Sequence, residues 1–342
     1  MVLNVLLTTT VADPEICHPL DAIVKVKLCA ICGSDLHVYH GRESGLDHGT
    51  VMGHEFMGEI VELGKDVNNL SIGDRVVSAF STSCGHCYFC RKGLTSRCQA
   101  SQVFGWVQHG QGLQGAQAEY VRVPNAQHTL MKPSPALSDE QSLMLGDILS
   151  TGYHAAKSAA IKPGGICAIV GCGPVGMMAA VGALEQGAES VFIIDRIPER
   201  LAIAERFGAT PINFDTTDAI QVINDSTDGR GADAVIEMVG SPQASSLAFD
   251  LVRPGGIISI AGVHNEPHFT ISPTQAYDKN LTIVSGRCPA RAYMETLKDV
   301  AKSGRYDLSA IISHRITLQE GCEGYDMFEN RRDNCTKVVL SI

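Results

Sequence analysis

The sequence predicts an α/β protein, with a mainly β first part followed by a doubly wound parallel sheet. Three observations lead to this prediction. The first 130 or so residues contain short segments that alternate apolar and polar side chains. From about residue 150 to 286, apolar strands alternate with helices, and a glycine-rich turn lies within that part. At 342 residues, the chain is long enough for one large domain or two medium ones.

The first part is expected to form short strands joined by polar turns that are rich in Gly, Asp and Asn. The expected strands are Ala22–Leu28, Glu59–Leu63, Asp74–Ala79 and Ala118–Val123.

The second part contains continuous apolar runs bounded by Gly or Asp, which are typical of fully buried parallel strands. The expected strands are Ile166–Val170, Val191–Ile194, Pro211–Phe214, Ala234–Val239, Ile257–Ala261 and Leu281–Val284. The expected helices are Glu140–Leu149, Tyr153–Ala160, Val175–Leu184, Pro198–Phe207, Ala219–Asn224 and Ala244–Leu251. Six strands with crossover helices predict a doubly wound sheet. A helix at Met294–Ser303 and a strand at Lys337–Ser341 are expected to close the chain.

Charge and composition exclude several classes of function. The formal net charge is −10 at pH 7, which disfavours a surface that tracks nucleic-acid phosphates, so we expect no nucleic-acid partner. No apolar run is long enough to cross a bilayer, and Met1–Val11 has neither a basic segment nor a cleavage site. We therefore expect a cytoplasmic protein with no membrane role. Of the 12 cysteines, four cluster and the others are dispersed, unlike a secreted disulfide framework.

The clustered cysteines predict a closed zinc site. Cys84, Cys87, Cys90 and Cys98 follow C-x2-C-x2-C-x7-C spacing. Short spacers let neighbouring sulfurs reach one ion at about 2.3 Å, and the longer loop returns the fourth sulfur. Four thiolates fill the coordination sphere, so this zinc is expected to stabilise a lobe over about 81–100 rather than to do chemistry. Disulfides or unrelated buried thiols are the alternative interpretations.

The glycine-rich turn predicts a dinucleotide site. Gly171, Gly173 and Gly176 form G-x-G-x-x-G between an expected strand and an expected helix, and Asp195 ends the next strand. Gly171 would permit the turn, Gly173 the approach of a pyrophosphate and Gly176 close helix–strand packing. Asp195 would accept hydrogen bonds from ribose hydroxyls, which favours NAD over NADP, although Arg196 could receive a 2′-phosphate. An ordinary βα turn, with Asp195 as a helix cap or a surface charge, is the alternative.

Three further candidate ligands are far apart in the sequence. Cys32 lies in Cys-Gly-Ser-Asp, His54 in Gly-His-Glu and Asp147 in Gly-Asp-Ile-Leu-Ser-Thr. One thiolate, one imidazole and one carboxylate would leave the fourth position of a zinc ion open, as in catalytic sites. Spacing alone does not join these segments.

The order of these motifs resembles the zinc-dependent medium-chain alcohol dehydrogenase family over essentially the whole chain. Asp147 in Asp-Ile-Leu-Ser-Thr-Gly-Tyr-His, with Val-Arg-Pro-Gly-Gly and Ser-Gly-Arg-Cys-Pro-Ala-Arg, resembles its formaldehyde-dehydrogenase-like branch. The chain departs from that pattern in an abbreviated first hairpin and in lacking the long insertion of the dismutating enzymes. The resemblance implies a GroES-like catalytic domain over 1–149, a Rossmann domain over 150–286, and a return to the catalytic domain over 287–342.

The resemblance also implies roles for single residues. Cys32, His54 and Asp147 would hold the catalytic zinc, Asp35 would orient His54, and Glu55 would approach the metal during ligand exchange. The remaining implied residues are Ser34 and His37 as a proton relay, Phe80 in the substrate pocket, Thr151 and Val175 at the nicotinamide, Arg200 at the adenosine ribose and Lys337 near the pyrophosphate. Trp106 is a second candidate for the pocket, and an ordinary core position is the alternative for both aromatic residues. For Asp147, the alternative is a position in a helix, with water as the third zinc ligand. For His37, the alternative is a surface histidine.

Together these roles imply reversible hydride transfer between a small primary or secondary alcohol and NAD, giving an aldehyde or ketone. The expected protein is a homodimer or homotetramer with one catalytic and one structural zinc ion per chain. A formaldehyde or polyol dehydrogenase is the alternative within the family. A zinc-free quinone reductase would lack Cys32, His54 and the cysteine run, whereas a non-catalytic zinc- and nucleotide-binding sensor would lack the relay of Ser34 and His37.

Overall fold

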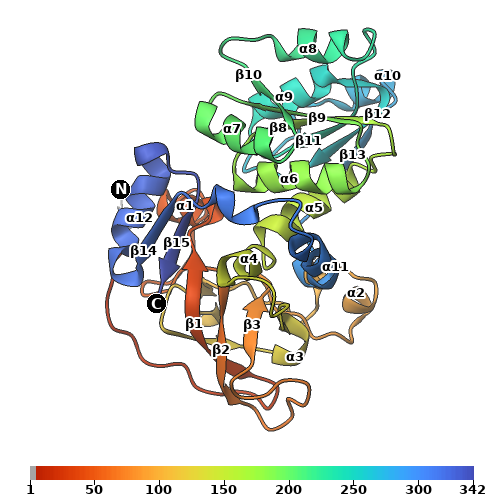
Figure 1. Ribbon diagram of the computed structural model, residues 1–342. Helices are drawn as coiled ribbons and strands as arrows, with labels where there is room; N and C mark the ends of the chain where they lie inside the picture. The colour runs from red at the N-terminus through yellow and green to blue at the C-terminus, as the bar shows by residue number, and fades with distance from the viewer. Residues whose placement is uncertain (1–4) are drawn as a thin grey trace. The chain divides into compact units, whose positions relative to one another are not determined.

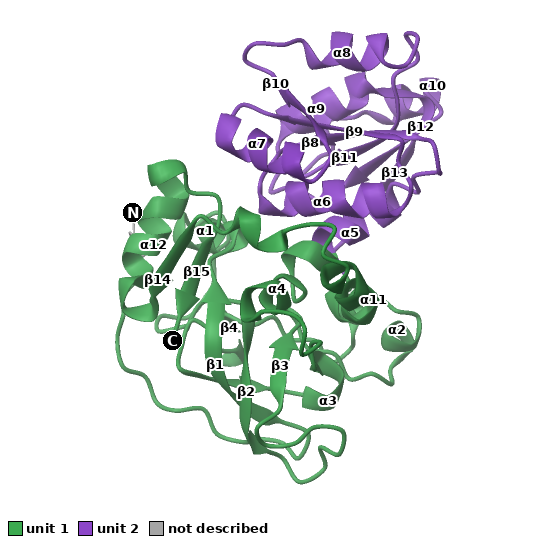
Figure 2. Cartoon of the chain, viewed as in Figure 1, with its two compact units in different colours: residues 1–150, 289–342 green, residues 151–288 purple. Residues whose placement is uncertain are grey.

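The computed structural model describes residues 5–342, which form two compact units (Figure 2). The first unit extends to Ser150 and resumes over Pro289–Ile342, and the second is Thr151–Cys288. The expected boundaries after 149 and 286 fall one and two residues earlier. No helix within residues 5–342 is both long enough and apolar enough to cross a membrane.

The first unit is built on a seven-stranded sheet in the order β14-β15-β1-β2-β3-β7, with β6 also paired to β1 (Figure 1). Its strands are β1 (Ala22–Ala30), β2 (Glu55–Leu63), β3 (Arg75–Ser78), β6 (Tyr120–Val123), β7 (Leu130–Met131), β14 (His314–Thr317) and β15 (Val338–Ser341). A separate hairpin joins β4 (Trp106–Gln108) to β5 (Gln111–Leu113). Only β14 and β15 pair in parallel among these strands. Alternation along β1 buries Val24 and Val26 and exposes Lys25, as a sheet with one covered face requires.

The helices of the first unit are short. They are α1 (Gly33–Tyr39), α2 (Tyr88–Arg91), α3 (Ala126–Thr129), α4 (Asp139–Met144), α11 (Ala290–Lys302) and α12 (Gly321–Asn330), with 3-10 turns at Thr95–Arg97, Leu308–Ile311, Leu318–Glu320 and Arg332–Asn334. The helix α5 (Ile148–Ser158) carries the chain into the second unit.

The second unit contains the predicted six-stranded parallel sheet, in the order β10-β9-β8-β11-β12-β13. Its strands are β8 (Ile166–Val170), β9 (Ser190–Asp195), β10 (Thr210–Asn213), β11 (Ala232–Glu237), β12 (Val252–Ile260) and β13 (Thr282–Ser285). Its further helices are α6 (Pro174–Glu185), α7 (Pro198–Arg206), α8 (Ala219–Asp225), α9 (Pro242–Leu251) and α10 (Pro273–Asp278). Helices cover both faces, with α6 on one side and α8 on the other in Figure 1. The predicted doubly wound fold is therefore confirmed.

The structure corrects the expected helix Glu140–Leu149. It breaks into α4 and α5, and Asp147 lies in the turn between them. A Cβ on Gly146, in the same turn, would lie 2.2 Å from the Ser78 carbonyl oxygen, so a residue with a side chain would not fit there. The turn thus packs directly on the end of β3. The helices α1, α10 and α12 and the strand β14 were not expected. The polar Gly-Ser-Asp-Leu-His stretch of α1 and the glycines of α12 hide the helical apolar pattern.

Candidate functional site

The structure brings four potential ligands from three distant segments to one place. One ligand atom each from Cys32, His54, Glu55 and Asp147 lies within 4.8 Å of the other three. Cys32 Sγ is 3.8 Å from Asp147 Oδ2, and His54 Nε2 is 3.3 Å from the same oxygen. Thiol, imidazole and carboxylate groups at this spacing can bind one borderline-soft cation such as zinc. This cluster lies wholly within the first unit.

Strand pairing explains how Cys32 and His54 meet. In the antiparallel register of β1 and β2, Ala30 pairs with Glu55. Cys32 follows the end of β1 by two residues and His54 directly precedes β2, so both lie at the same end of the sheet. Asp147 reaches this end through the turn that packs on β3, the strand next to β2.

Asp35 ties two members of the cluster together. Its Oδ2 accepts a hydrogen bond from the Cys32 backbone N–H at 2.9 Å, and its Oδ1 lies 3.2 Å from His54 Nδ1. The Asp35 side chain is only 3% exposed. A proton on Nδ1 therefore faces Asp35 and leaves Nε2 directed at the cluster, where Ser34 Oγ lies 3.3 Å away.

The two oxygens of the Glu55 carboxylate have different surroundings. Its Oε1 pairs with the ammonium of Lys337, which also donates to the Ile31 carbonyl at 3.0 Å. Its Oε2 is buried and has no hydrogen-bond partner among residues 5–342. A buried carboxylate oxygen without a protein donor beside three other ligands is suited to a cation.

The same contacts place Lys337 in a buried ion pair, and its expected role near the pyrophosphate stays a prediction. Its side chain is 1% exposed and its ammonium is engaged by Glu55 and Ile31 inside the first unit. A lysine within the apolar strand region Thr-Lys-Val-Val-Leu was the sequence signal for a buried ion pair.

Burial and neighbouring charges shift the pKa values in the cluster. Burial, with Glu55 adding to it, raises the pKa of the Cys32 thiol. Burial alone would lower the pKa of His54, but the Asp35 carboxylate and hydrogen bonds to Asp147 and Asp35 raise it well above its usual value. The chain without a cation thus favours a protonated thiol and a charged imidazole. A bound cation needs the opposite forms, so binding would release protons.

Two of the other predicted residues lie close to the cluster along the chain or in space. The Phe80 ring is 6.5 Å from the His54 ring, at an interplanar angle of 85°. His37 is on α1, one turn after Ser34, and is half-buried. Burial lowers the pKa of His37, and Arg42 lowers it further against the opposing effect of Glu43. Trp106 lies in β4, half-buried, and its backbone pairs with Leu113.

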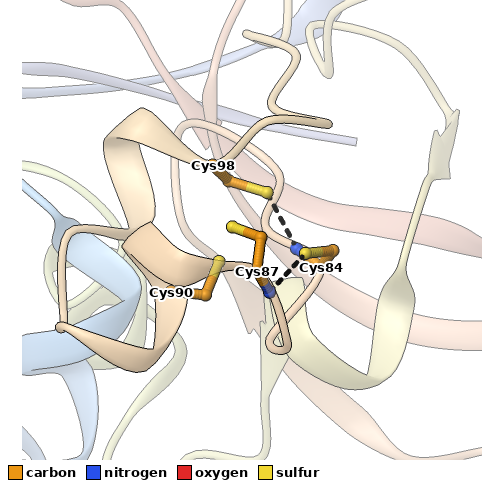
Figure 3. Close-up of side chains that lie close together, drawn as sticks. All are labelled: Cys84, Cys87, Cys90 and Cys98. Carbon is orange, nitrogen blue, oxygen red and sulfur yellow. Dashed lines mark hydrogen bonds between the residues drawn. The ribbon is translucent and has the colours of Figure 1, made fainter.

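The predicted cysteine lobe is also assembled. One sulfur each from Cys84, Cys87, Cys90 and Cys98 lies within 4.8 Å of the others (Figure 3). The Cys84 N–H donates to Cys98 Sγ at 3.2 Å, and the Cys87 N–H donates to Cys84 Sγ at 3.4 Å. Backbone N–H groups of Cys90 and Gln99 lower the pKa of Cys87 to about 6. All 12 cysteines are free thiols, so the disulfide alternative is not supported.

The glycine-rich turn of the second unit has the geometry of a phosphate-binding loop. Gly171 has φ +102°, which L side chains rarely adopt, and a Cβ on Gly176 would lie 2.0 Å from the Gly171 carbonyl oxygen. A Cβ on Gly173 would meet no atom within 4 Å, so the backbone there is open to a ligand. Gly173 is the N-cap of α6, whose first turn includes Val175.

Asp195 anchors this turn to the end of β9. Its Oδ2 accepts from the Cys172 N–H at 2.8 Å, and its Oδ1 accepts from the N–H groups of Arg196 and Ile197 at 2.7 and 3.1 Å. Arg200, on α7, accepts a hydrogen bond at its carbonyl from Cys172 Sγ at 3.3 Å. The side chain of Arg196 lies over the Phe214 ring at 5.0 Å. Anchoring the turn uses three hydrogen bonds to Asp195, and a carboxylate can accept about four, so Asp195 can still accept from a further partner. Thr151 lies on α5, at the start of the second unit.

One buried acid of the second unit was missed. Glu237 ends β11 and is fully buried, and its Oε1 accepts from the N–H groups of Val239 and Gly240 at 2.7 and 2.8 Å. Its Oε2 lies 3.0 Å from His264 Nε2. An acidic residue at the end of an apolar strand was the available signal, as at Asp195.

Comparisons with known proteins agree with this arrangement. Residues 18–134 match the family described as alcohol dehydrogenase GroES-like domain, and residues 174–303 match the family described as zinc-binding dehydrogenase. The chain is 44% identical over 323 residues to zinc-type alcohol dehydrogenase B of Aspergillus flavus, covering 92% of this chain and 74% of the relative.

Solved structures give the same result. Alcohol dehydrogenase TADH from Thermus sp. ATN1 superposes with a TM-score of 0.91 at 40% identity, over 97% of this chain and 95% of that one. A zinc-binding dehydrogenase from Sinorhizobium meliloti bound to NADP has a TM-score of 0.84 at 27% identity, over 97% and 94% of the two chains. The motifs, the two-unit fold and these matches together show that the chain belongs to the zinc-type medium-chain alcohol dehydrogenase family and is an oxidoreductase of that family.

Proposed function

We propose that the protein is an NAD-dependent alcohol dehydrogenase in which Cys32, His54 and Asp147 bind a catalytic zinc ion. The observation that carries the proposal is the meeting of these three side chains, from segments up to 115 residues apart, with Ser34 beside them. A closed structural site would hold four committed protein ligands. Here the fourth candidate, Glu55, is engaged by Lys337 through one oxygen, so Cys32, His54 and Asp147 would leave one position for a substrate.

The residues present fit the metal. The donor set of thiol, imidazole and carboxylate suits zinc, and the unpartnered Glu55 Oε2 gives the cation a further carboxylate during ligand exchange. The four cysteines of the lobe fit a second, structural zinc ion. Asp35 holds the Cys32 backbone and the His54 ring at once, so it would fix both ligands before the metal arrives.

Residues of this chain would accept the proton that the alcohol loses. When bound, zinc supplies a Lewis acid for the substrate oxygen and NAD supplies an acceptor for hydride. Ser34 Oγ, 3.3 Å from His54 Nε2, would receive the hydroxyl proton of the alcohol. His37 lies one turn further along α1 and, with its lowered pKa, is neutral and able to accept a proton near pH 7. Phe80, next to His54, would provide an apolar wall for the carbon side of the substrate.

NAD rather than NADP is proposed from the surroundings of Asp195. Its carboxylate lies at the end of β9 beside the glycine-rich turn, where it would accept from ribose hydroxyls and repel a 2′-phosphate. The Arg196 guanidinium over the Phe214 ring is partly engaged there. The NADP bound to the Sinorhizobium relative shows that family membership leaves this choice open. Gly171, Gly173, Val175 and Gly176 would bind the pyrophosphate, with Thr151 and Arg200 as further cofactor contacts.

The proposed substrates are small primary or secondary alcohols and their aldehydes or ketones. The Asp147 motif suggests the formaldehyde-dehydrogenase-like branch, so formaldehyde and polyols are included among the candidates. A homodimer or homotetramer is proposed from family resemblance, and a cytoplasmic location from the distribution of the cysteines in the sequence.

The test is turnover of purified protein with NAD, a panel of alcohols and zinc, followed by NADH absorbance. Cys32→Ala and Asp147→Ala should lower turnover at least a hundredfold, whereas Cys17→Ala, at an exposed cysteine outside both clusters, should not. Protein that binds NAD and zinc but oxidises no alcohol and reduces no aldehyde or ketone in the panel would indicate the non-catalytic alternative. Unchanged turnover in Cys32→Ala protein that lacks zinc at this site would refute the mechanism.

A further inference from the structure

A buried pair of a glutamate and a histidine joins two loops of the second unit. Glu237 ends β11 with its side chain 0% exposed, and its Oε2 lies 3.0 Å from His264 Nε2. Because His264 follows the end of β12, the pair connects the loop after β11 to the loop after β12. The other polar neighbours of the imidazole are Ser245 Oγ, 3.5 Å from Nε2, and Glu266 Oε2, 3.4 Å from Nδ1. The proposed hydride transfer uses neither Glu237 nor His264 directly.

Glu237 also fixes the backbone of both loops. Its Oε1 accepts from the N–H groups of Val239 and Gly240 in the first loop, at 2.7 and 2.8 Å. Its main-chain carbonyl oxygen accepts from the N–H groups of Ala261 and Gly262 in the second loop, at 2.9 and 3.0 Å. A single residue therefore holds the two loops together, and the His264 imidazole completes the partners of its buried carboxylate.

The two loops are in close contact through bare backbone. A Cβ on Gly240, where φ is +77°, would lie 2.2 Å from the Val263 carbonyl oxygen. A Cβ on Gly262 would lie 2.8 Å from Glu237 Oε2. Neither position has room for a side chain, so the loops and the carboxylate between them form one tightly packed assembly.

These loops lie beside the point where the strand order of the sheet reverses. In the order β10-β9-β8-β11-β12-β13, the chain proceeds from β8 toward one edge and from β11 toward the other. All six strands are parallel, so the glycine-rich turn after β8 and the loops after β11 and β12 follow the same edge of the sheet. In doubly wound sheets, ligands bind in the crevice at this reversal.

The strand order separates the two halves of a dinucleotide. Asp195, at the end of β9, is the proposed ribose ligand, and the turn after β8 is the proposed pyrophosphate site. A dinucleotide that continues in the same direction reaches the loops after β11 and β12. The ends of these four neighbouring strands cover about 14 Å, at about 4.8 Å for each interval. The nicotinamide half therefore falls at the loops that Glu237 and His264 join.

Two exposed valines give these loops an apolar surface. Val239 and Val263 are 53% and 46% exposed, although they flank the buried pair. A Cβ on Gly171 would lie 2.7 Å from Val239 Cγ2, so Val239 lies directly against the glycine-rich turn. Apolar side chains beside a polar turn suit a ligand that carries a flat ring next to its phosphates.

We propose that Glu237 and His264 are positioning residues that hold the loops after β11 and β12 as one wall for the nicotinamide half of the cofactor. The inference rests on the proposed binding of a nicotinamide dinucleotide. The pair acts through the backbone of the loops that carry Val239 and Val263, and not through contact with the cofactor. Loss of the imidazole removes the partner of a buried carboxylate oxygen and releases the second loop.

The test compares the binding of NADH with that of ADP-ribose, which lacks the nicotinamide ring, by titration calorimetry of the zinc-loaded protein. His264→Ala should weaken NADH binding about tenfold or more and ADP-ribose binding less than about twofold. His268→Ala, at an exposed histidine of the same unit, should change neither affinity. Unchanged NADH binding by the His264→Ala protein, or equal weakening of both ligands, would overturn the proposal.

Two further variants separate positioning from folding. His264→Gln keeps an N–H donor for Glu237 Oε2, so it should recover most of the NADH affinity. In Glu237→Gln/His264→Ala, the loss of NADH affinity should be smaller than the product of the two single losses, because both substitutions break one link. No recovery in His264→Gln, or independent losses in the double variant, would contradict that link.

The wild-type protein distinguishes a failure of this inference from a failure of the proposed function. Tight binding of NADPH with weak binding of NADH would refute the NAD preference, and the same variants would then be compared with NADPH and 2′-phospho-ADP-ribose. Normal NADH binding by both the wild-type and the His264→Ala protein would refute the positioning role alone. Wild-type protein that binds neither dinucleotide would refute the proposed function and this inference with it.

Discussion

Lys337 and Glu55 form an ion pair in which both side chains are almost fully buried, at 1% and 0% exposure. The pair connects the strand region before β15 to the first residue of β2, next to His54. Burial would lower the pKa of Lys337, but Glu55, together with Cys32 and Asp147, raises it above its usual value. The pair therefore positions the Glu55 carboxylate beside the candidate ligands Cys32, His54 and Asp147.

Removing only the lysine should be costly. Lys337→Met leaves the Glu55 carboxylate buried without its counter-charge, and we expect a loss of about 3–5 kcal/mol in the free energy of unfolding. The double variant Lys337→Met/Glu55→Gln should recover part of this loss. Urea denaturation measures both. Arg332→Met, which breaks the exposed pair with Asp326, is the control and should cost less than about 1 kcal/mol. Equal losses for the two single variants would contradict the importance of burial.

The four-cysteine lobe should stabilise the protein through its metal. Cys98→Ser replaces a thiolate ligand with a weaker one, and we expect one zinc ion per chain to be lost and the melting temperature to fall, by about 2–4 °C for each kcal/mol of lost stability. Elemental analysis and calorimetry provide the measurements. Cys17→Ser should change neither quantity, because Cys17 is exposed and outside both clusters. Full zinc content in Cys98→Ser would argue against tetrathiolate binding.

His37 should determine how the rate of alcohol oxidation falls at low pH. A relay histidine accepts protons only when neutral, and burial lowers its pKa below the ordinary value of about 6.5. Above about pH 6.5, His37 is neutral and the oxidation rate should not depend on its protonation. The rate should fall as the pH decreases through the lowered pKa of His37. His37→Gln should reduce kcat about a hundredfold, the lower end of what a positioned base contributes, and remove this fall at low pH. His268→Gln, at an exposed histidine of the second unit, should retain the wild-type pH profile.

Asp195 should determine the preference for NAD. Asp195→Asn weakens charge-assisted hydrogen bonds worth about 1.5–3 kcal/mol, so kcat/KM with NAD should fall roughly 10- to 150-fold. Use of NADP should improve at the same time, because the repulsion of its 2′-phosphate is removed. Initial rates with both cofactors measure the change. If Arg196→Ala in the Asp195→Asn background abolishes NADP use, Arg196 receives the phosphate. A lower rate with both cofactors alike would instead indicate loss of the anchored turn at Cys172.

Much of the fold could be predicted because its signals are local. Apolar runs such as Ile166–Val170 and the adjacent Gly171 specify a buried strand and a turn within a few residues. The α4–α5 break at Asp147 could not be predicted, because the close packing of Gly146 on the Ser78 carbonyl of another strand leaves no local pattern in the sequence. The pair of Lys337 and Glu55 could not be predicted for a similar reason, since the two residues are 282 positions apart in the chain.

The sequence by itself determined the α/β fold class, the four-cysteine lobe and the glycine-rich turn, because each depends on spacing within a short segment. Only the tertiary structure joined Cys32, His54 and Asp147, because the β1–β2 register and the packing of Gly146 on β3 decide which segments meet. It also decided that Lys337 pairs with Glu55. Long-range contacts of this kind leave no periodicity in the sequence, because they depend on how separate elements pack together.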